Sequence, residues 1–121
     1  IIIKDNKILH TLSSDKCSSY PNYWTMPGGR IELGETSIEN VIREVKEEVN
    51  LKFNPTKLFA TFQWNNMELY RYLGTWEGNI KLEESESIDY DFFTYKQSLD
   101  LELAFDYKEI INNLYHQKMI K

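Results

Sequence analysis

Residues 29–51 read GRIELGETSIENVIREVKEEVNL and contain the strongest structural signal in the chain. Thr36 and Glu39 are spaced as in a capping box, in which each side chain accepts a hydrogen bond from a free amide at a helix start. Apolar residues then recur at intervals of three and four. This predicts a helix over Ser37–Val49 whose core-facing side chains are Ile38, Val41, Ile42, Val45 and Val49. Asn50 tolerates the left-handed conformation that ends a helix, so we expect the helix to stop there.

The acidic residues of this helix are concentrated on one side. At about 100° per residue, Glu44, Glu47 and Glu48 share one face, which we expect to be exposed. Their mutual repulsion destabilises a helix by roughly 0.2–0.5 kcal/mol per pair. A divalent cation would turn that repulsion into coordination, and oxygen ligands favour Mg²⁺ or Mn²⁺ over zinc. A solvated charged face is the alternative interpretation of these residues.

The spacing of the fixed residues resembles a known signature. Gly29 is followed by five residues and Glu35, then by seven residues and the run Arg43–Leu51. This resembles the Nudix box of the MutT/Nudix hydrolase family, which reads Gly, five residues, Glu, seven residues, Arg-Glu-apolar-any-Glu-Glu-any-Gly-apolar. Every specified position matches except Asn50, which replaces the last glycine. The preceding Trp24–Gly28 is similar to the family's lead-in.

The resemblance implies a hydrolase that cleaves a nucleoside diphosphate linked to another group, by water attack on phosphorus with Mg²⁺ or Mn²⁺ at the box helix. It implies that Glu44, Glu47 and Glu48 are metal ligands. It also implies that Glu44, Arg43 and Glu47 are catalytic, with Glu44 the first choice for the general base. Arg43 lies four residues before Glu47, where an ion pair can orient the carboxylates, although an ordinary surface ion pair is the alternative.

The glycines before the helix are the expected substrate contacts. Gly28 and Gly29 carry no side chain, so a diphosphate can approach the backbone there, and the Gly28 carbonyl is a further candidate metal ligand by family analogy. Trp24 is assigned to the substrate site with them. Glu35 is expected to brace the box loop, with a direct metal role as the alternative.

A second acidic cluster follows at Glu83–Asp91. Members of the family take the general base either from the box helix or from an acid on a later loop. Asp89 and Asp91 precede Phe92-Phe93 as an acid precedes an aromatic residue in family members, which makes Glu86, Asp89 and Asp91 candidates for an extra ligand or base. A solvated acidic loop is the alternative.

The other segments predict a mixed fold. Apolar runs flank a turn at Asp5-Asn6, and two aromatic-rich strands between Lys57 and Glu77 meet near Asn65-Asn66. Short strands are expected at Tyr23–Met26 and Phe92-Phe93, and a terminal helix is expected from the spacing of Leu103, Tyr107, Ile110, Ile111 and Leu114.

This order resembles the Nudix α/β/α sandwich, in the α/β class, with a mixed, mostly antiparallel sheet. We expect one domain over residues 1–121, with the box at 29–51. Ile1 starts inside an apolar run, which leads us to expect that the N-terminus is truncated.

Composition restricts the partners. Hydrophobic residues make up 41% of the chain, which favours a folded protein over a disordered or membrane-embedded one. The 14 basic and 19 acidic residues give a net charge of −5, which disfavours extended nucleic acid as a partner. Cys17 is the one cysteine, so the chain suits the reducing cytoplasm. The sequence does not indicate an oligomeric state.

The resemblance leaves the substrate open. Subfamilies that cleave ADP-ribose carry a proline some fifteen residues beyond the box, and this chain has no proline after Pro55. We therefore expect a small nucleoside triphosphate, ordinary or modified, with dinucleoside polyphosphates and capped RNA ends as alternatives. Candidates for stacking on the base are Trp24, Trp64, Tyr70 and Trp76, although core packing is the alternative for each. Two other hypotheses are a non-catalytic nucleotide sensor and a metal-free partner-binding domain.

Overall fold

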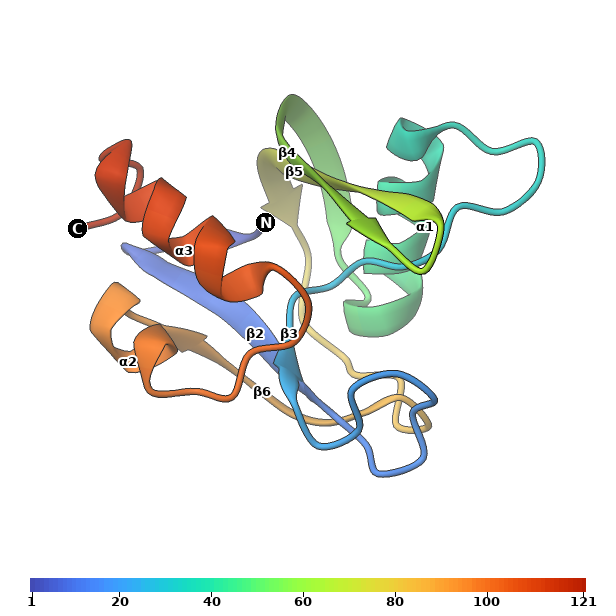
Figure 1. Ribbon diagram of the computed structural model, residues 1–121, viewed down its shortest axis with the longest axis horizontal. Coiled ribbons are helices and arrows are strands. Elements are labelled where there is room, and N and C mark those ends of the chain that lie inside the picture. The colour runs from blue at the N-terminus through green and yellow to red at the C-terminus, as the bar shows by residue number, and fades with distance from the viewer. The chain divides into compact units, whose positions relative to one another are not determined.

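The computed structural model describes residues 1–121, which divide into two units. The first unit comprises Ile1–Ile2 and Pro27–Glu83, and the second comprises Ile3–Met26 and Glu84–Lys121 (Figure 1). None of the helices has the length and apolar character needed to cross a membrane.

The first unit contains helix α1 (Ser37–Val49) and the long hairpin of β4 (Lys52–Trp64) and β5 (Met67–Glu77). The two strands pair antiparallel and are joined at Asn65-Asn66, as predicted. Both asparagines have positive φ (48° and 61°), which a tight two-residue hairpin turn requires. The first strand begins five residues earlier than the predicted aromatic-rich segment, and a register shift after Pro55 lets the strand include the proline.

Helix α1 has the predicted bounds and the predicted caps. The Thr36 side chain accepts from the Glu39 amide, the Glu39 carboxylate accepts from the Thr36 amide, and Asn50 is left-handed at the C-terminal cap (φ 62°). Three of the expected core residues are buried: Val41, Val45 and Val49. The prediction is wrong for Ile38 and Ile42, which are 49% and 40% exposed. Periodicity gives the direction of a side chain but not how far the covering element extends.

The second unit is built around strand β2 (Lys7–Ser13), which has partners on both edges. Strand β6 (Ser87–Phe93) pairs along β2, while β1 (Ile3–Lys4) and β3 (Trp24–Thr25) pair with the two ends of β2. All of these pairings are antiparallel. A parallel bridge between Trp24 and Leu103 makes the arrangement mixed, as predicted.

The opening turn and the last strand of the second unit test two further predictions. The hairpin turn at Asp5-Asn6 is confirmed, since both residues have positive φ and join paired strands. The last strand is longer than the predicted Phe92-Phe93, because β6 begins at Ser87 and includes Asp89 and Asp91. Asp89 and Asp91 are exposed on this strand, so the strand can include them without burying their charges.

Two helices complete the second unit, α2 (Tyr95–Leu99) and α3 (Tyr107–His116). The terminal helix was predicted, although Leu103 precedes its start. Helix α2 was not predicted, because five residues are too few to show a helical period. The buried apolar side chains of this unit are Ile8, Leu9, Met26, Ala104, Tyr107, Ile110, Ile111, Leu114 and Ile120.

Candidate active site on helix α1

The two glycines before α1 bring bare backbone against the acidic face of the helix. The Gly28 amide donates to Oε2 of Glu48 at 3.2 Å. A Cβ atom added to Gly29 would lie 2.5 Å from Cδ of Glu44, so only glycine leaves room for this carboxylate. Gly28 and Gly29 therefore lie beside the acids with which the sequence associated them.

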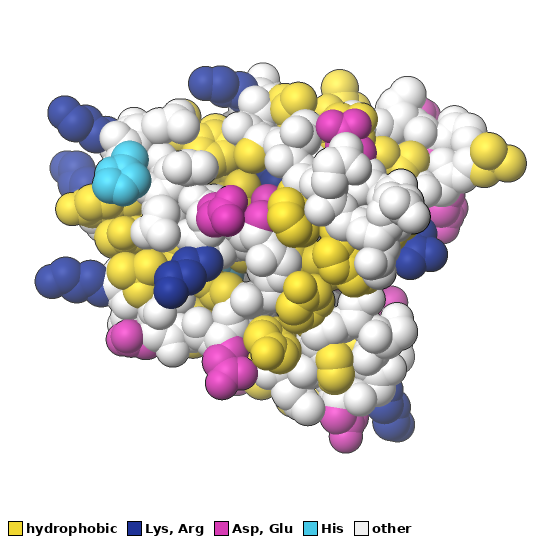
Figure 2. All heavy atoms as spheres, in the orientation of Figure 1, with side chains coloured by type: hydrophobic (Ala, Val, Ile, Leu, Met, Phe, Trp, Pro, Cys, Tyr) yellow, Lys and Arg dark blue, Asp and Glu magenta, His cyan; other side chains and the backbone are white.

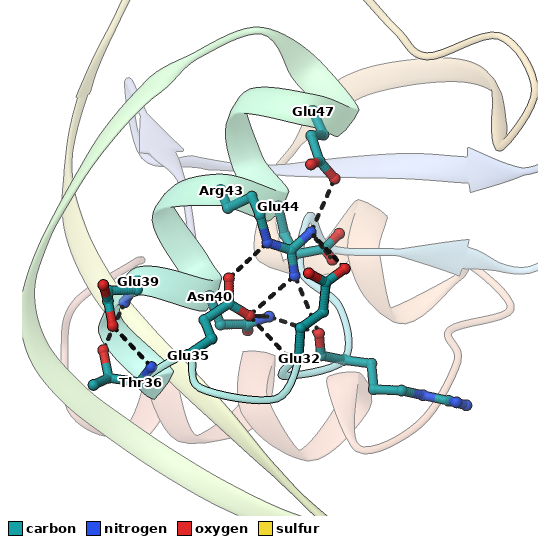
Figure 3. A network of polar contacts seen from close by, with 9 residues as sticks. Glu32, Glu35, Thr36, Glu39, Asn40, Arg43, Glu44 and Glu47 are labelled. Carbon is teal, nitrogen blue, oxygen red and sulfur yellow. Dashed lines mark hydrogen bonds and ion pairs between the residues drawn. The ribbon is translucent and has the colours of Figure 1, made fainter.

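Arg43 is the centre of the polar network (Figure 3). Its Nη1 contacts Oε1 of Glu44 at 3.0 Å and Oε2 of Glu47 at 3.1 Å, which confirms the predicted ion pair and extends it to a second acid. The Glu32 carboxylate is more distant, at 3.7 Å. Hydrogen bonds from the guanidinium to Glu35 raise the pKa of Arg43, which therefore carries a permanent positive charge in the cluster. The arginine holds two neighbouring carboxylates in fixed orientations.

Glu35 connects the box loop to the helix, as predicted. Its Oε2 accepts from Nε of Arg43 at 2.6 Å, and its Oε1 accepts from Nη2 of Arg43, the Glu32 amide and Asn40 Nδ2. The hydrogen bonds from Arg43, followed by that from the Glu32 amide, lower the pKa of Glu35 to about 2. Both oxygens already have donors, so this geometry gives Glu35 the bracing role.

The three acids proposed as ligands differ in exposure. The Glu44 side chain is 15% exposed and that of Glu47 is 58% exposed, so the prediction of one exposed face is wrong for Glu44. The carboxyl groups of Glu44 and Glu48 interact with each other. Burial raises the pKa of Glu44, the positive charge of Arg43 opposes this, and the negative charge of Glu47 adds to it. Glu44 is thus a carboxylate held near like charges in a partly desolvated position.

The chain does not form a converged group of three acidic, histidine or cysteine side chains. Arg43 forms ion pairs with one oxygen of Glu44 and one of Glu47, while Glu48 accepts a hydrogen bond from the Gly28 amide. The three carboxylates therefore have different partners.

The second acidic cluster divides between the two units. Glu83 belongs to the first unit, and its amide donates to the carbonyl of Glu48 at 3.0 Å, beside the C-terminal end of α1. The sequence placed Glu83 in the second acidic cluster but not among its candidate ligands, because a contact between residues this far apart leaves no local pattern. The predicted candidates Glu86, Asp89 and Asp91 lie in the second unit and are exposed.

The aromatic candidates are all half-buried. Trp24 belongs to the second unit, where its ring packs edge-on against Phe93 with the centroids 5.0 Å apart. Trp64, Tyr70 and Trp76 lie on the β4–β5 hairpin of the first unit, and the Tyr70 hydroxyl donates to Glu68 at 3.3 Å. Stacking on a base stays a prediction for each of them.

Comparison with known proteins identifies one family. A family model described as the NUDIX domain matches residues 1–114. A MutT NUDIX hydrolase from Burkholderia pseudomallei has the same fold, with a TM-score of 0.81 at 19% identity over 92% of this chain and 90% of that one. The expected Nudix fold class is therefore confirmed.

Curated relatives of several activities also match. An 8-oxo-dGTP diphosphatase of Buchnera aphidicola is 34% identical over 69% of this chain and 66% of its own length. An ADP-ribose pyrophosphatase of Methanocaldococcus jannaschii is 49% identical over 42% of this chain and 29% of its length. An m7GpppN-mRNA hydrolase, NUDT17 of Danio rerio, is 33% identical over 60% of this chain, which spans only 21% of that protein.

Proposed function

The chain belongs to the Nudix hydrolase family, and from this we propose that it is a Mg²⁺-dependent hydrolase of nucleoside diphosphate derivatives. The favoured substrate is a small nucleoside triphosphate, ordinary or modified, cleaved by water to a nucleoside monophosphate and pyrophosphate. The observation that carries the proposal is the position of two acids beside the glycines: Glu48 accepts from the Gly28 amide, and Glu44 fills the space that a side chain at Gly29 would take.

The chemistry of these residues fits a hard divalent cation. Glu44, Glu47 and Glu48 offer only oxygen donors, which Mg²⁺ and Mn²⁺ prefer. Burial and the negative charge of Glu47 raise the pKa of Glu44, so its charged form is costly in this position, and a bound cation would add to the compensation that Arg43 provides. When bound, the cation would neutralise phosphate charge and lower the pKa of a water molecule. Mn²⁺ is an equivalent ion for this donor set.

The other residues of the site have supporting roles in the proposal. Arg43 orients Glu44 and Glu47 through its Nη1. Glu44, whose pKa is raised by burial, is the first choice for accepting a proton from the attacking water. Gly28 and Gly29 leave the backbone open to the diphosphate. The assignment of Trp24 to the substrate site stays a prediction from the sequence.

Three observations favour a small nucleotide as substrate. Among the three curated relatives described above, this chain spans the largest share of the 8-oxo-dGTP diphosphatase, at 66% of its length. The net charge of −5 disfavours long contacts with RNA, although the cap hydrolase keeps a capped RNA end as the alternative. The proline associated with ADP-ribose cleavage is missing, and the ADP-ribose pyrophosphatase match spans only 51 residues.

A single cysteine, Cys17, supports the cytoplasm as the location in this proposal.

The test is the release of phosphate, pyrophosphate or mononucleotide from a substrate panel with Mg²⁺. The panel contains ordinary and 8-oxo nucleoside triphosphates, ADP-ribose, dinucleoside polyphosphates and a cap analogue. Glu47→Gln and Glu48→Gln should each slow the reaction by at least about 100-fold with folding intact, because a bound cation is worth several kcal/mol in the transition state. Full activity in both variants would refute the metal site, and a wild-type protein without turnover on the whole panel would favour the nucleotide sensor.

A further inference from the structure

Asn40 is a buried polar residue on α1 that the sequence signature leaves unassigned. It falls among the seven unspecified residues between Glu35 and Arg43. Its side chain is buried, and asparagine is a poor helix former, so neither helix propensity nor apolar packing accounts for it. A buried amide needs hydrogen-bond partners, and the identity of those partners indicates what this residue does.

The Asn40 amide ties together the two ends of the box loop. Its Nδ2 donates to the carbonyl of Arg30 at 2.8 Å and to Oε1 of Glu35 at 3.3 Å (Figure 3). Both partners can only accept, so the nitrogen side of the amide must face them. One side chain therefore fixes the loop just after Gly29 and just before the helix cap at Thr36.

Arg43 makes the same two contacts from one turn further along the helix. Its Nη2 donates to the Arg30 carbonyl at 3.3 Å and to Oε1 of Glu35 at 3.0 Å. Asn40 and Arg43 therefore share both acceptors, and with these held, the Nη1 of Arg43 reaches Glu44 and Glu47. Loss of Asn40 would leave Arg43 alone to hold the loop.

Asn40 is also connected to Glu44 through the backbone of the box loop. Arg30 follows Gly29, where the Glu44 carboxylate occupies the space that a Cβ atom would take. A shift of the Arg30 carbonyl would move Gly29 and open the space that fixes Glu44. The position of this carboxylate thus depends on Asn40 through the backbone as well as through Arg43.

We propose that Asn40 is a positioning residue that holds the box loop so that Glu44 and Arg43 are correctly placed for cation binding and hydrolysis. This inference rests on the proposed function, because it presupposes that Glu44, Glu47 and Glu48 bind a divalent cation. It goes beyond the family signature, because the signature specifies no residue type at this position.

The test measures Mn²⁺ binding, by electron paramagnetic resonance of the free ion, together with the kinetics of the reaction. Asn40→Ala should weaken Mn²⁺ binding about tenfold and lower kcat about tenfold while changing KM less than twofold, as loss of a residue that orients metal ligands does. Asn40→Asp keeps the size but replaces the donor by a negative charge beside Glu35, and should weaken Mn²⁺ binding at least as much.

Val41→Ala is the matched control, since Val41 is the next residue on α1, belongs to the buried apolar core, and has a side chain that cannot hydrogen-bond to the loop. It should lower the melting temperature more than Asn40→Ala does, yet bind Mn²⁺ like the wild type. The inference about Asn40 would be overturned, with the proposed function intact, if Asn40→Ala bound Mn²⁺ like the wild type. The same would follow if both variants lost Mn²⁺ binding in proportion to the fall in their melting temperatures. A wild-type protein that binds no Mn²⁺ would overturn the proposed function and this inference with it.

Discussion

Arg43 shows how one residue can organise several carboxylates. An exposed ion pair on a helix contributes only about 0.3–0.5 kcal/mol. Arg43 is different, because its side chain is 25% exposed, its partner Glu35 is 12% exposed, and the guanidinium makes two parallel contacts with that carboxylate. The planar fork of arginine suits this arrangement, and lysine cannot reproduce it.

Replacing Arg43 by lysine tests this role. Arg43→Lys retains the charge but cannot contact Glu35, Glu44 and Glu47 together, so we expect kcat to fall at least about tenfold, as for lost support of metal ligands. The control is Lys52→Ala, which removes the exposed ion pair with Glu77 (79% and 73% exposed) and should leave kcat unchanged. Steady-state kinetics at saturating Mg²⁺ compares them, and unchanged kcat in Arg43→Lys would contradict the orienting role.

Gly29 permits a second residue-scale prediction. Gly29→Ala would place a Cβ atom 2.5 Å from Cδ of Glu44, so this carboxylate must move, and we expect a large loss of Mg²⁺-dependent hydrolysis. Leu33→Ala is the control, because Leu33 lies in the same loop and is fully exposed. Hydrolysis rates and thermal melts of the two variants give the comparison. Wild-type rates in Gly29→Ala would show that the close packing of Glu44 has no functional role.

At the scale of elements, the two helices with capping boxes offer a matched pair. Thr36 caps α1 and Thr94 caps α2, each with a reciprocal partner three residues later. Loss of an N-cap side chain typically costs about 1 kcal/mol. We expect Thr36→Ala to speed amide hydrogen exchange in the first turn of α1, and Thr94→Ala to do so at Gln97 in α2. Exchange that rises equally in both helices for either variant would contradict this local effect.

The elements also show what a sequence can predict. The bounds of α1, its left-handed Asn50 and the turn at Asn65-Asn66 are confirmed, because each depends on residues within a few positions. Predictions that depend on distant partners were less successful. The exposure of Ile38 and Ile42 and the contact of Glu83 with the end of α1 are set by other elements and leave no local signal.

The candidate site divides in the same way. The pairing of Arg43 with Glu47 follows from helical geometry and was predicted. The contact of Arg43 with Glu44 was not, because adjacent residues of a helix normally point in different directions. The contact of Asn40 with Arg30 was not, because it requires the folded loop.

At the scale of the whole molecule, stability should depend on pH through His10. This residue is fully buried on β2, and its Nε2 lies 2.9 Å from Oγ of Ser98. Burial, the main cause, lowers the pKa of His10 from 6.5 to about 4. The unfolded chain therefore binds a proton more readily, so stability falls as the pH drops from about 6.5 to 4, by up to about 3 kcal/mol.

Denaturant unfolding at several pH values checks this dependence. His10→Gln keeps a hydrogen-bonding side chain but does not titrate, so its stability should fall less between pH 6.5 and 4. His116→Gln, at an exposed position of α3, should behave like the wild type. A pH dependence in His10→Gln equal to that of the wild type would assign the effect to other groups.

The net charge of −5 affects which anionic ligands the protein can bind, and the distribution of the acidic side chains matters for this. On the face shown in Figure 2, acidic side chains form small separate groups instead of one broad patch. Under the proposed function, a small diphosphate is accommodated where a cation offsets the local charge, and we expect extended nucleic acid to bind poorly because a net negative protein repels its phosphates.

Binding of a divalent cation by the acids of α1 is tested by the melting temperature measured as a function of Mg²⁺ concentration. A ligand that binds only the native state stabilises it, by about 1.4 kcal/mol at ten times its Kd. We predict that Mg²⁺ raises the melting temperature of the wild type by several degrees and that Glu48→Gln reduces or abolishes this rise. An equal rise in both proteins, or no rise in the wild type, would contradict the account.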